Sequence, residues 1–294
     1  MKELLLTGGS GFIGRNILES FLAREFRICA PSSRELDLTD TDCVDAFFKG
    51  RQFDAVLHAA VRPTHRNARN AQDAFFANVR MFENLVRHRG SFGRFIDFGS
   101  GAVYGVEGDI SGAREEDIGK RVGADSHGFC KYVLHRRMES LSDFVELNIF
   151  GIFGKYEDYS IRFISNALCK ALCGLPITLR RNRRFSYLFA EDLPEILKHF
   201  LNKKPEFLSY NITPDSYVEL ADLALMAREA AGADVEIKIA APGMGPDYYG
   251  DNSRLRREFG RLQFTPIRGA VGKLCEYYRG RLADIDRKLL LFDK

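Results

Sequence analysis

The feature that most constrains the fold of this chain is the stretch LLLTGGSGFIGRNI, which begins at residue 4. Gly8, Gly11 and Gly14 follow an apolar, strand-like run and open an amphipathic, helix-like one. Glycines at this spacing let the backbone turn sharply and approach a pyrophosphate, whose charge is met by the helix N-terminus. Because strand, glycine turn and helix occur in the required order, the stretch predicts a dinucleotide-binding unit.

The first 150 residues repeat this order of a strand followed by a helix. The strand-like runs are almost continuously apolar, as expected of parallel strands that are buried on both faces. The pattern predicts an α/β fold, a doubly wound Rossmann-type parallel sheet with helices on both faces. The expected strands are residues 3–7, 26–30, 55–59, 94–99 and 144–150, and the expected helices are 12–23, 40–49, 72–88 and 127–141.

The pattern changes after about residue 150, where glycine and proline become more frequent. We expect a dinucleotide-binding domain at residues 1–153, with part of 185–212 returning to it. Residues 154–294 are expected to form mainly a smaller, interleaved α/β lobe that binds substrate. Its expected helices are 160–173, 191–201, 217–231 and 267–279, its expected strands are 185–189 and 235–240, and 241–251 has the composition of a loop.

The overall charge of the chain is small, with a formal value of +3 over 294 residues. This balance argues against nucleic acid or an anionic membrane as the partner. No apolar run approaches the roughly 20 residues that span a bilayer. The six cysteines are scattered without the spacing of metal ligands, so we expect no metal and a reduced, cytoplasmic protein.

The residues after the second expected strand bear on the choice of nicotinamide cofactor. An acidic residue there would bind the ribose 2′-hydroxyl of NAD, whereas an arginine accommodates the 2′-phosphate of NADP. The strand is followed by PSSRELD, so Ser33 and Arg34 offer a hydroxyl and a guanidinium. This favours NADP with NAD as the alternative, unless Arg34 is an ordinary solvated loop residue.

Several further stretches resemble, in order and spacing, the extended short-chain dehydrogenase/reductase superfamily, especially its nucleotide-sugar epimerase and reductase branch. They are DAVLHAAV at 54–61, FFANVRMFENLV at 75–86, FGSGAVYG at 98–105, HGFCKYV at 127–133 and RRFSYLFAEDL at 183–193. The resemblance covers most of the chain and implies a cofactor site of matching residues. The implied cofactor-binding residues are Gly8, Gly11, Phe12, Ile13, Gly14, Ser33, Arg34, Asp37, Leu38, His58, Ala59, Ala60, Asn78 and Lys131.

The resemblance also implies a catalytic set. In the family a serine and a tyrosine hold the substrate oxygen, while a lysine one helical turn later lowers the pKa of the tyrosine and binds the nicotinamide ribose. Carried onto this chain, the serine is Ser100 and the lysine is Lys131. The tyrosine position is occupied by His127, which departs from the family pattern.

Three interpretations of His127 remain open. Histidine titrates near neutral pH and so can replace the tyrosine as the acid, although the nearby Lys131 would lower its pKa and leave a neutral ring. Alternatively another phenol, that of Tyr104, Tyr156 or Tyr159, supplies the proton. In the third interpretation the chemistry is lost, and the chain binds the cofactor as a regulator or partner subunit.

Two neighbouring features narrow the subclass that the resemblance implies. Dehydratases of this branch carry an acidic pair directly after the serine, and the sequence GAVYG lacks it. The GDP-fucose synthase type carries a cysteine two residues after the serine, where this chain has Ala102. A 4-keto reductase or an epimerase that acts on a nucleotide-sugar therefore remains, with the silent cofactor-binding subunit as the alternative.

The basic stretch LRRNRRFSYLF supplies candidates for the substrate diphosphate. The resemblance implies that Arg183 or Arg184 binds this group and that Tyr104 contacts the substrate. Arg254 and Arg268 are looser candidates for a second arginine, and the cluster also fits a solvated hairpin or a patch that binds RNA. Many members of the family are homodimers through the catalytic helix, an expectation that the charged sequence KYVLHRRMESL weakens.

Overall fold

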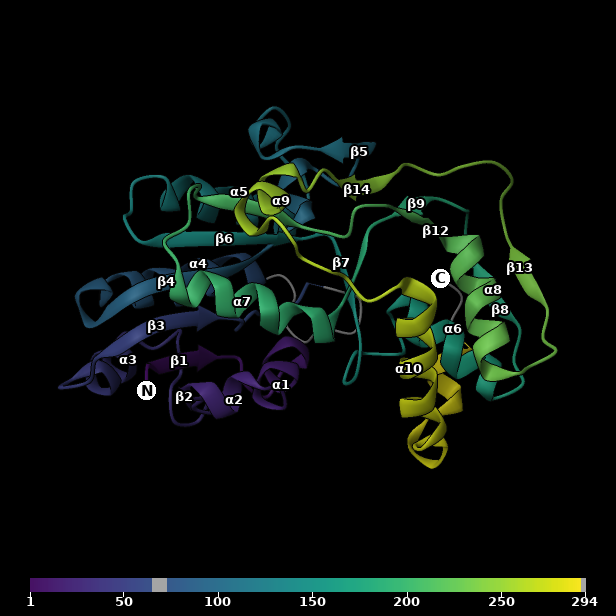
Figure 1. Cartoon of the computed structure of the whole chain (residues 1–294), viewed down its shortest axis with the longest axis horizontal. Helices are drawn as coiled ribbons and strands as arrows, with labels where there is room; N and C mark the ends of the chain where they lie inside the picture. The colour runs from purple at the N-terminus through teal and green to yellow at the C-terminus, as the bar shows by residue number, and fades with distance from the viewer. Residues whose placement is uncertain (65–72, 292–294) are drawn as a thin grey trace.

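A computed structural model describes residues 1–64 and 73–291 of the chain, and Figure 1 shows its arrangement. Its centre is a six-stranded sheet in the order β11-β6-β4-β3-β1-β2, in which every pair is parallel. This arrangement confirms the predicted doubly wound parallel sheet. The six strands are β1 (Glu3–Thr7), β2 (Arg27–Cys29), β3 (Phe53–His58), β4 (Phe92–Ser100), β6 (Phe144–Ile149) and β11 (Ser209–Ile212).

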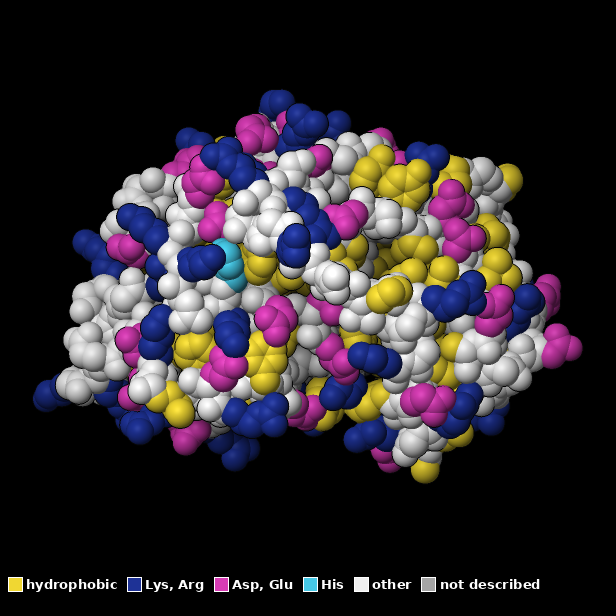
Figure 2. Space-filling view, viewed as in Figure 1, with side chains coloured by type: hydrophobic (Ala, Val, Ile, Leu, Met, Phe, Trp, Pro, Cys, Tyr) yellow, Lys and Arg dark blue, Asp and Glu magenta, His cyan; other side chains and the backbone are white. Residues whose placement is uncertain are grey.

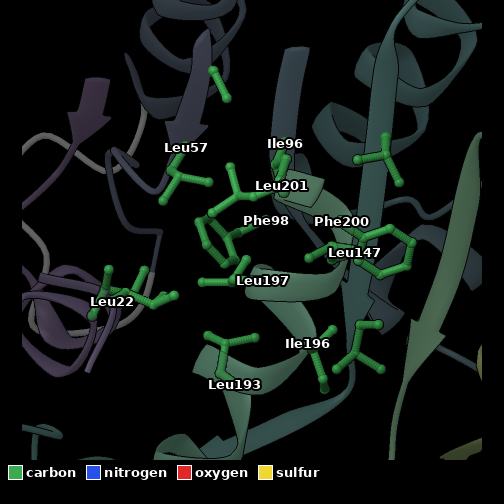
Figure 3. Close-up of a cluster of buried hydrophobic side chains, with 14 of the residues drawn as sticks. Leu22, Leu57, Ile96, Phe98, Leu147, Leu193, Ile196, Leu197, Phe200 and Leu201 are labelled. Atoms are coloured by element: carbon green, nitrogen blue, oxygen red, sulfur yellow. The ribbon is translucent and has the colours of Figure 1, made fainter. Parts of the chain in front are cut away.

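Helices cover both faces of the central sheet. One face packs against α1 (Phe12–Leu18), α2 (Leu22–Glu25) and α7 (Leu193–Asn202). Figure 3 shows Leu57, Ile96 and Leu147 of the strands beside Leu197 and Phe200 of α7. The opposite face packs against α3 (Thr41–Phe48), α4 (Ala74–Val86) and α5 (Ser126–Met138). Burial of apolar side chains on both faces explains the nearly continuous apolar runs of the strands.

A second apolar core lies in the C-terminal part of the chain. It joins α6 (Phe163–Leu172), α8 (Leu220–Ala231) and α10 (Ile267–Arg279) through buried side chains. The short parallel pair β8 (Ile177–Leu179) and β13 (Ile237–Ile239) borders these helices. Figure 1 shows this body beside the central sheet, with α10 on the side nearer the sheet and β13 at the far edge.

The two bodies are joined by short strands at the carboxyl edge of the central sheet. β7 (Gly151–Phe153) pairs with β10 (Tyr187–Phe189), and a four-stranded sheet has the order β12-β9-β14-β5. Its members are β5 (Ile110–Ala113), β9 (Arg184–Phe185), β12 (Val218–Glu219) and β14 (Tyr248–Gly250). The chain therefore crosses repeatedly between the two bodies, since α7 and β11 lie with the central sheet. The division at residue 153 stays a prediction.

Some expected elements differ from the observed ones. The single helix expected at 12–23 is wrong, because α1 and α2 are separate helices divided at residues 19–21. The loop expected at 241–251 contains β14, whose pairing with β5 comes from far away in the sequence and gives no local signal. Helix α9 (Ser253–Phe259) has no counterpart among the expected helices. The short 3-10 turns are η2 (Arg89–Ser91), η3 (Gly101–Tyr104), η4 (Glu115–Asp117), η5 (Ala190–Asp192), η6 (Leu282–Asp284) and η7 (Arg287–Leu290).

The surface agrees with the small net charge. Figure 2 shows acidic and basic side chains interspersed over the visible face of the molecule. Among the described residues, none of the helices has the length and apolar character needed to cross a membrane.

Candidate active site

A pocket of about 250 Å³ lies where the carboxyl ends of the central strands meet the C-terminal body. Its lining includes Ser100, His127 and Lys131, the three residues expected to form the catalytic set. The pocket is also lined by expected cofactor residues from the glycine turn and from the end of β3, namely Phe12, Ile13, His58, Ala59 and Ala60. The fold therefore brings the expected catalytic set and a large part of the expected cofactor site into one cavity.

The glycine turn is packed so tightly that side chains are excluded from it. Gly8 has φ +70°, and a Cβ added there would lie 2.6 Å from the backbone nitrogen of Ala60. A Cβ on Gly14 would lie 2.2 Å from the carbonyl oxygen of Gly8. Gly11 occupies the N-cap of α1, and no side chain caps this helix end. A turn with these properties fits a pyrophosphate, which needs close approach and free N–H groups.

The residues after β3 are held by buried polar contacts. Thr7 Oγ1 lies 2.8 Å from His58 Nδ1, and burial lowers the pKa of His58 to about 4. The Asn78 side chain accepts a hydrogen bond from the Arg62 backbone nitrogen at 2.7 Å and donates one to the Arg62 carbonyl oxygen at 3.0 Å. His58 and Asn78 thus shape the wall of the pocket, and only His58 lines it directly.

The segment after β2 is the expected adenosine end of the cofactor site. Ser33 and Arg34 are exposed there, and Arg34 makes no ion pair within the part of the chain that the structure describes. The nearby acid Glu35 is already engaged, because the Ser32 backbone nitrogen and hydroxyl both donate to its carboxylate at 2.8 Å. Further along, Leu38 is buried, whereas Asp37 is exposed and hydrogen-bonds to Thr39, which lowers the pKa of Asp37.

Helix α5 presents the lysine and the histidine of the catalytic set. The helix begins there because the Asp125 carboxylate accepts hydrogen bonds from the backbone nitrogens of His127 and Gly128. Lys131 follows one turn after His127, so both side chains lie on one helix face. Lys131 Nζ donates to the carbonyl oxygen of Phe98 at 2.7 Å and lies 3.4 Å from Asp97 Oδ2. These contacts hold the ammonium at the carboxyl end of β4.

The imidazole of His127 lies half-buried in the pocket wall. It makes no hydrogen bond with any side chain or backbone group of residues 1–64 and 73–291. Burial lowers the pKa of His127 to about 4, and the positive charge of Lys131 acts in the same direction. The ring is therefore neutral near pH 7, so it offers one N–H to a substrate but is a poor acid.

Ser100 ends β4, and its Oγ accepts a hydrogen bond from the backbone nitrogen of Ala102 at 3.2 Å. The hydroxyl of Tyr248 on β14, a residue absent from the sequence-based set, lies beside this strand end, 2.8 Å from a Cβ built on the adjacent Gly101. Burial raises the pKa of Tyr248 to about 12, and the Ser100 contact opposes that rise. The only local signal was the pair of tyrosines in DYYGD, within a stretch whose composition indicated a loop.

The three phenols considered as alternatives to His127 all lie outside the pocket lining. Tyr104 is buried, and its hydroxyl donates to Asn211 Oδ1 at 2.7 Å. The hydroxyl of Tyr156 donates to Glu19, and that of Tyr159 accepts a hydrogen bond from the Asp286 backbone nitrogen at 2.9 Å. The substrate contact expected for Tyr104 has no support from its position, because its hydroxyl is used inside the core.

Arg183 and Arg184 are neighbours in the sequence but differ in whether a carboxylate lies close to the guanidinium. Arg183 is half-buried, with its guanidinium 5.3 Å from the ring centre of Phe185 and 5.9 Å from that of Tyr248. Burial lowers the pKa of Arg183, and within the described residues it forms no ion pair. Arg184 lies 3.5 Å from the carboxylate of Asp247. Arg183 therefore carries the guanidinium that is not neutralised by a close carboxylate.

A further arginine, Arg162, was not identified from the sequence. It is exposed, lines the pocket and lowers the pKa of His127, of Tyr187 and of Tyr248 through its charge. No ion pair to it is found in the described ranges 1–64 and 73–291. The looser candidates are engaged elsewhere, since Arg254 pairs with Glu116 and Arg268 pairs with Glu229.

Within residues 1–64 and 73–291, the side chains that usually bind metals do not gather at one point. Among the described residues, no group of three or more His, Cys, Asp or Glu side chains is placed to hold a metal ion.

Comparison with known proteins identifies the family to which the chain belongs and two of its relatives. The model of the NAD dependent epimerase/dehydratase family matches residues 4–213, from the first strand through the last strand of the central sheet. The chain belongs to this family. A curated relative, the GDP-L-colitose synthase of Yersinia pseudotuberculosis, is 22% identical over 302 residues, which cover 94% of this chain and 97% of the relative. The GDP-L-fucose synthase of Azorhizobium caulinodans is 26% identical and covers 68% of this chain and 74% of its own length.

A solved structure shows the same fold. A GDP-mannoheptose C4 reductase from Campylobacter jejuni with NADP bound superposes with a TM-score of 0.80 at 17% identity. The match covers 95% of this chain and 98% of that one. The second curated relative carries the name of the GDP-fucose synthase type, which the sequence disfavours because Ala102 stands where a cysteine is expected.

Proposed function

We propose that this chain is an NADP-dependent nucleotide-sugar reductase or epimerase, with NAD as the alternative cofactor. The proposal is supported most strongly by Ser100, His127 and Lys131 lining one pocket with the end of the glycine turn. The names of the two curated relatives, both GDP-sugar synthases, favour the same substrate class.

The residues around the pocket fit a dinucleotide. Gly8 and Gly14 leave no room for a Cβ, and the uncapped end of α1 offers N–H groups to a pyrophosphate. Lys131 is held at the pocket by the Phe98 carbonyl, within reach of a nicotinamide ribose. Ser33 and Arg34 supply a hydroxyl and a guanidinium for a 2′-phosphate. When bound, the nicotinamide would supply or accept the hydride at a sugar carbon.

Ser100 and His127 handle the oxygen of that carbon. Ser100 presents a hydroxyl at the end of β4, and the neutral imidazole adds an N–H donor. Two donors aimed at one oxygen stabilise the negative charge that develops there during reduction. The low pKa of His127 argues against a role as general acid, so its contribution is a hydrogen bond.

Two guanidiniums are available for the diphosphate of the substrate. Arg183 has no close carboxylate partner, and Arg162 lies exposed in the pocket lining. Their charges both act on Tyr187 and Tyr248, so the two side chains flank the same pair of rings. A diphosphate between two arginines makes charge-assisted hydrogen bonds to both.

Thermal denaturation with a ligand panel tests the proposal. A ligand that binds only the folded state raises stability by RT ln(1 + [L]/Kd), so cofactor and sugar class are measured in one assay. We expect NADPH to raise Tm more than NADH, and a GDP-4-keto sugar to add a further increase. If no nucleotide-sugar changes Tm in the presence of saturating cofactor, the proposed substrate class is wrong.

The alternative of a catalytically silent cofactor-binding subunit has one observation in its favour, the neutral ring at position 127. It predicts that nucleotide-sugars do not change Tm and that cofactor alone does. A homodimer through α5 and a cytoplasmic location also stay proposals. The exposed Phe76 and the stacked pair Phe75 and Phe129 support the dimer, which light scattering would test.

A further inference from the structure

Tyr248 reaches the active site from a strand of the small sheet. β14 pairs with β5 and β9, and this pairing fixes the direction of the tyrosine. The ring is 7% exposed and packs against Phe150 at 5.3 Å and Phe185 at 4.8 Å between ring centres. The phenol is therefore rigidly held, with its hydroxyl at the carboxyl end of β4.

The hydroxyl of Tyr248 occupies the space that a side chain at residue 101 would need. A Cβ added to Gly101 would lie 2.8 Å from Tyr248 Oη, so glycine at this position makes room for the phenol. The adjacent Ser100 is close enough to lower the pKa of Tyr248. Serine, glycine and tyrosine thus form one local arrangement, although residue 248 lies far from residues 100 and 101 in the sequence.

The hydrogen-bonding capacity of Ser100 decides what this contact does. A serine hydroxyl has one hydrogen to donate and two lone pairs that accept. One lone pair of Ser100 already accepts from the backbone nitrogen of Ala102 at 3.2 Å. If Tyr248 fills the second, the hydrogen of Ser100 has no internal acceptor and is left for a substrate oxygen in the pocket that Ser100 lines.

We propose that Tyr248 acts through Ser100, orienting the serine hydroxyl toward the substrate and supplying its proton. This inference rests on the proposed function and deepens it. Tyr248 is a positioning residue, since Ser100 and His127 touch the substrate while Tyr248 touches Ser100. The small sheet that joins the two bodies thereby supplies a phenol to a set that α5 leaves without its tyrosine.

The proton balance of the step is simple. As hydride reaches the carbonyl carbon, its oxygen takes the Ser100 proton, and Ser100 takes the Tyr248 proton. The substrate leaves as an alcohol, Ser100 regains its hydroxyl, and Tyr248 becomes a phenolate. Burial raises the pKa of Tyr248 to about 12, and the charges of Arg183 and Arg162 oppose that rise. An alkoxide is still more basic than this phenolate, so the transfer is favourable. Water reprotonates the phenolate after product release.

A crystal structure of the chain with NADP tests the contact independently of turnover. We expect Tyr248 Oη within about 3.2 Å of Ser100 Oγ, the range of a hydrogen bond. A separation greater than about 4 Å would overturn the proposal even if the enzyme is active. If the contact is present but no nucleotide-sugar is turned over, the proposed function fails, and with it the role of Tyr248 as a proton source.

Kinetics then separate the role of the hydroxyl from that of the ring. Tyr248→Phe keeps the packing against Phe150 and removes only the hydroxyl. We expect kcat to fall about 10- to 100-fold, the loss of one hydrogen bond to a developing charge, with KM and cofactor Kd unchanged within about twofold. Tyr249→Phe, on the same strand and packed against Tyr217, is the matched control and keeps full kcat. A kcat for Tyr248→Phe equal to that of the wild type overturns the proposal.

A second variant retains both the shape and the hydroxyl. Replacing Tyr248 with 3,5-difluorotyrosine makes the phenol more acidic without removing it. Ionisation of this phenol prevents donation, so the alkaline limit of kcat should move to lower pH by the change in phenol pKa. An alkaline limit that stays in place contradicts proton supply by Tyr248.

Discussion

The wall proposed to face the cofactor depends on close backbone contacts in the glycine turn, whereas the wall proposed to face the substrate depends on side chains from distant segments. On the first wall, Gly8 and Gly14 approach other backbone atoms so closely that a Cβ cannot be added. On the second wall, Arg162, Arg183 and Tyr248 come from three separate segments, just before α6, just before β9 and within β14. Binding at the first wall therefore requires that no side chain fills the turn. Binding at the second wall requires particular guanidinium and hydroxyl groups.

This difference explains which parts of the site were predictable. A glycine turn is local, so its spacing within a few residues already indicates the close approach of backbone to a pyrophosphate. Lys131 was equally accessible because the helical period links it to residue 127. Tyr248 and Arg162 gave no such signal, since they reach Ser100 and His127 only through strand pairing and packing between remote segments.

The elements of the fold also divide into those with a local sequence signal and those that depend on remote contacts. Five of the six strands of the central sheet were predicted, because long apolar runs mark buried parallel strands, whereas β11 was not among the expected strands. The three-residue strand β14 and the helix α9 were missed, as their formation depends on tertiary contacts. The neutral state of His127 was one of the outcomes foreseen from Lys131, but burial, which the sequence does not reveal, is the larger cause.

The largest effect is expected on the cofactor wall. Gly14→Ala would place a Cβ 2.2 Å from the Gly8 carbonyl oxygen, so the turn must open. Overpacking of this kind costs about 1–3 kcal/mol and distorts the site as well. We expect NADPH affinity to fall at least about 100-fold, measured by fluorescence titration.

Gly90→Ala is the control for this variant, because a Cβ there meets no atom within 4 Å. It should bind NADPH like the wild type. If Gly14→Ala and Gly90→Ala bind NADPH with equal affinity, cofactor binding does not require the absence of a side chain at residue 14.

A smaller effect is expected on the substrate wall. Arg183→Gln removes the guanidinium without a close carboxylate partner, so affinity for a nucleoside diphosphate should fall about 10- to 100-fold. Arg184→Gln is the matched comparison, since Asp247 already neutralises Arg184. Calorimetry with GDP measures both. A larger loss in Arg184→Gln would assign the diphosphate to the other arginine.

The smallest effect concerns stability. The pKa of His58 and that of His127 are lowered to about 4 in the folded chain, so between that pH and about 6.5 the unfolded state binds more protons. Stability from these groups is therefore present above about pH 6.5 and is lost as pH falls toward 4. A tenfold change in a proton-binding constant between the unfolded and folded chain corresponds to about 1.4 kcal/mol, and the effective value is smaller for the partly exposed His127.

Urea unfolding of the wild type and of His127→Asn measures this effect. The free energy of unfolding rises between pH 4.5 and pH 7 in the wild type. In His127→Asn we expect this rise to be smaller by about 1–2 kcal/mol. Because His135, whose pKa is raised by Glu146, titrates in both proteins, its opposite contribution cancels in the comparison. An unchanged pH dependence in the variant would mean that His127 titrates normally.

The most direct test of the account is the pH dependence of kcat for NADPH-driven reduction of a GDP-4-keto sugar, compared between wild type and His127→Asn. If the imidazole donates a hydrogen bond while the proton comes through Ser100, the wild-type profile is flat between about pH 5.5 and 8. The variant then keeps that flat profile at a rate lowered about tenfold. An acid–base limb near pH 6–7 that disappears in His127→Asn would identify His127 as the acid and contradict the account.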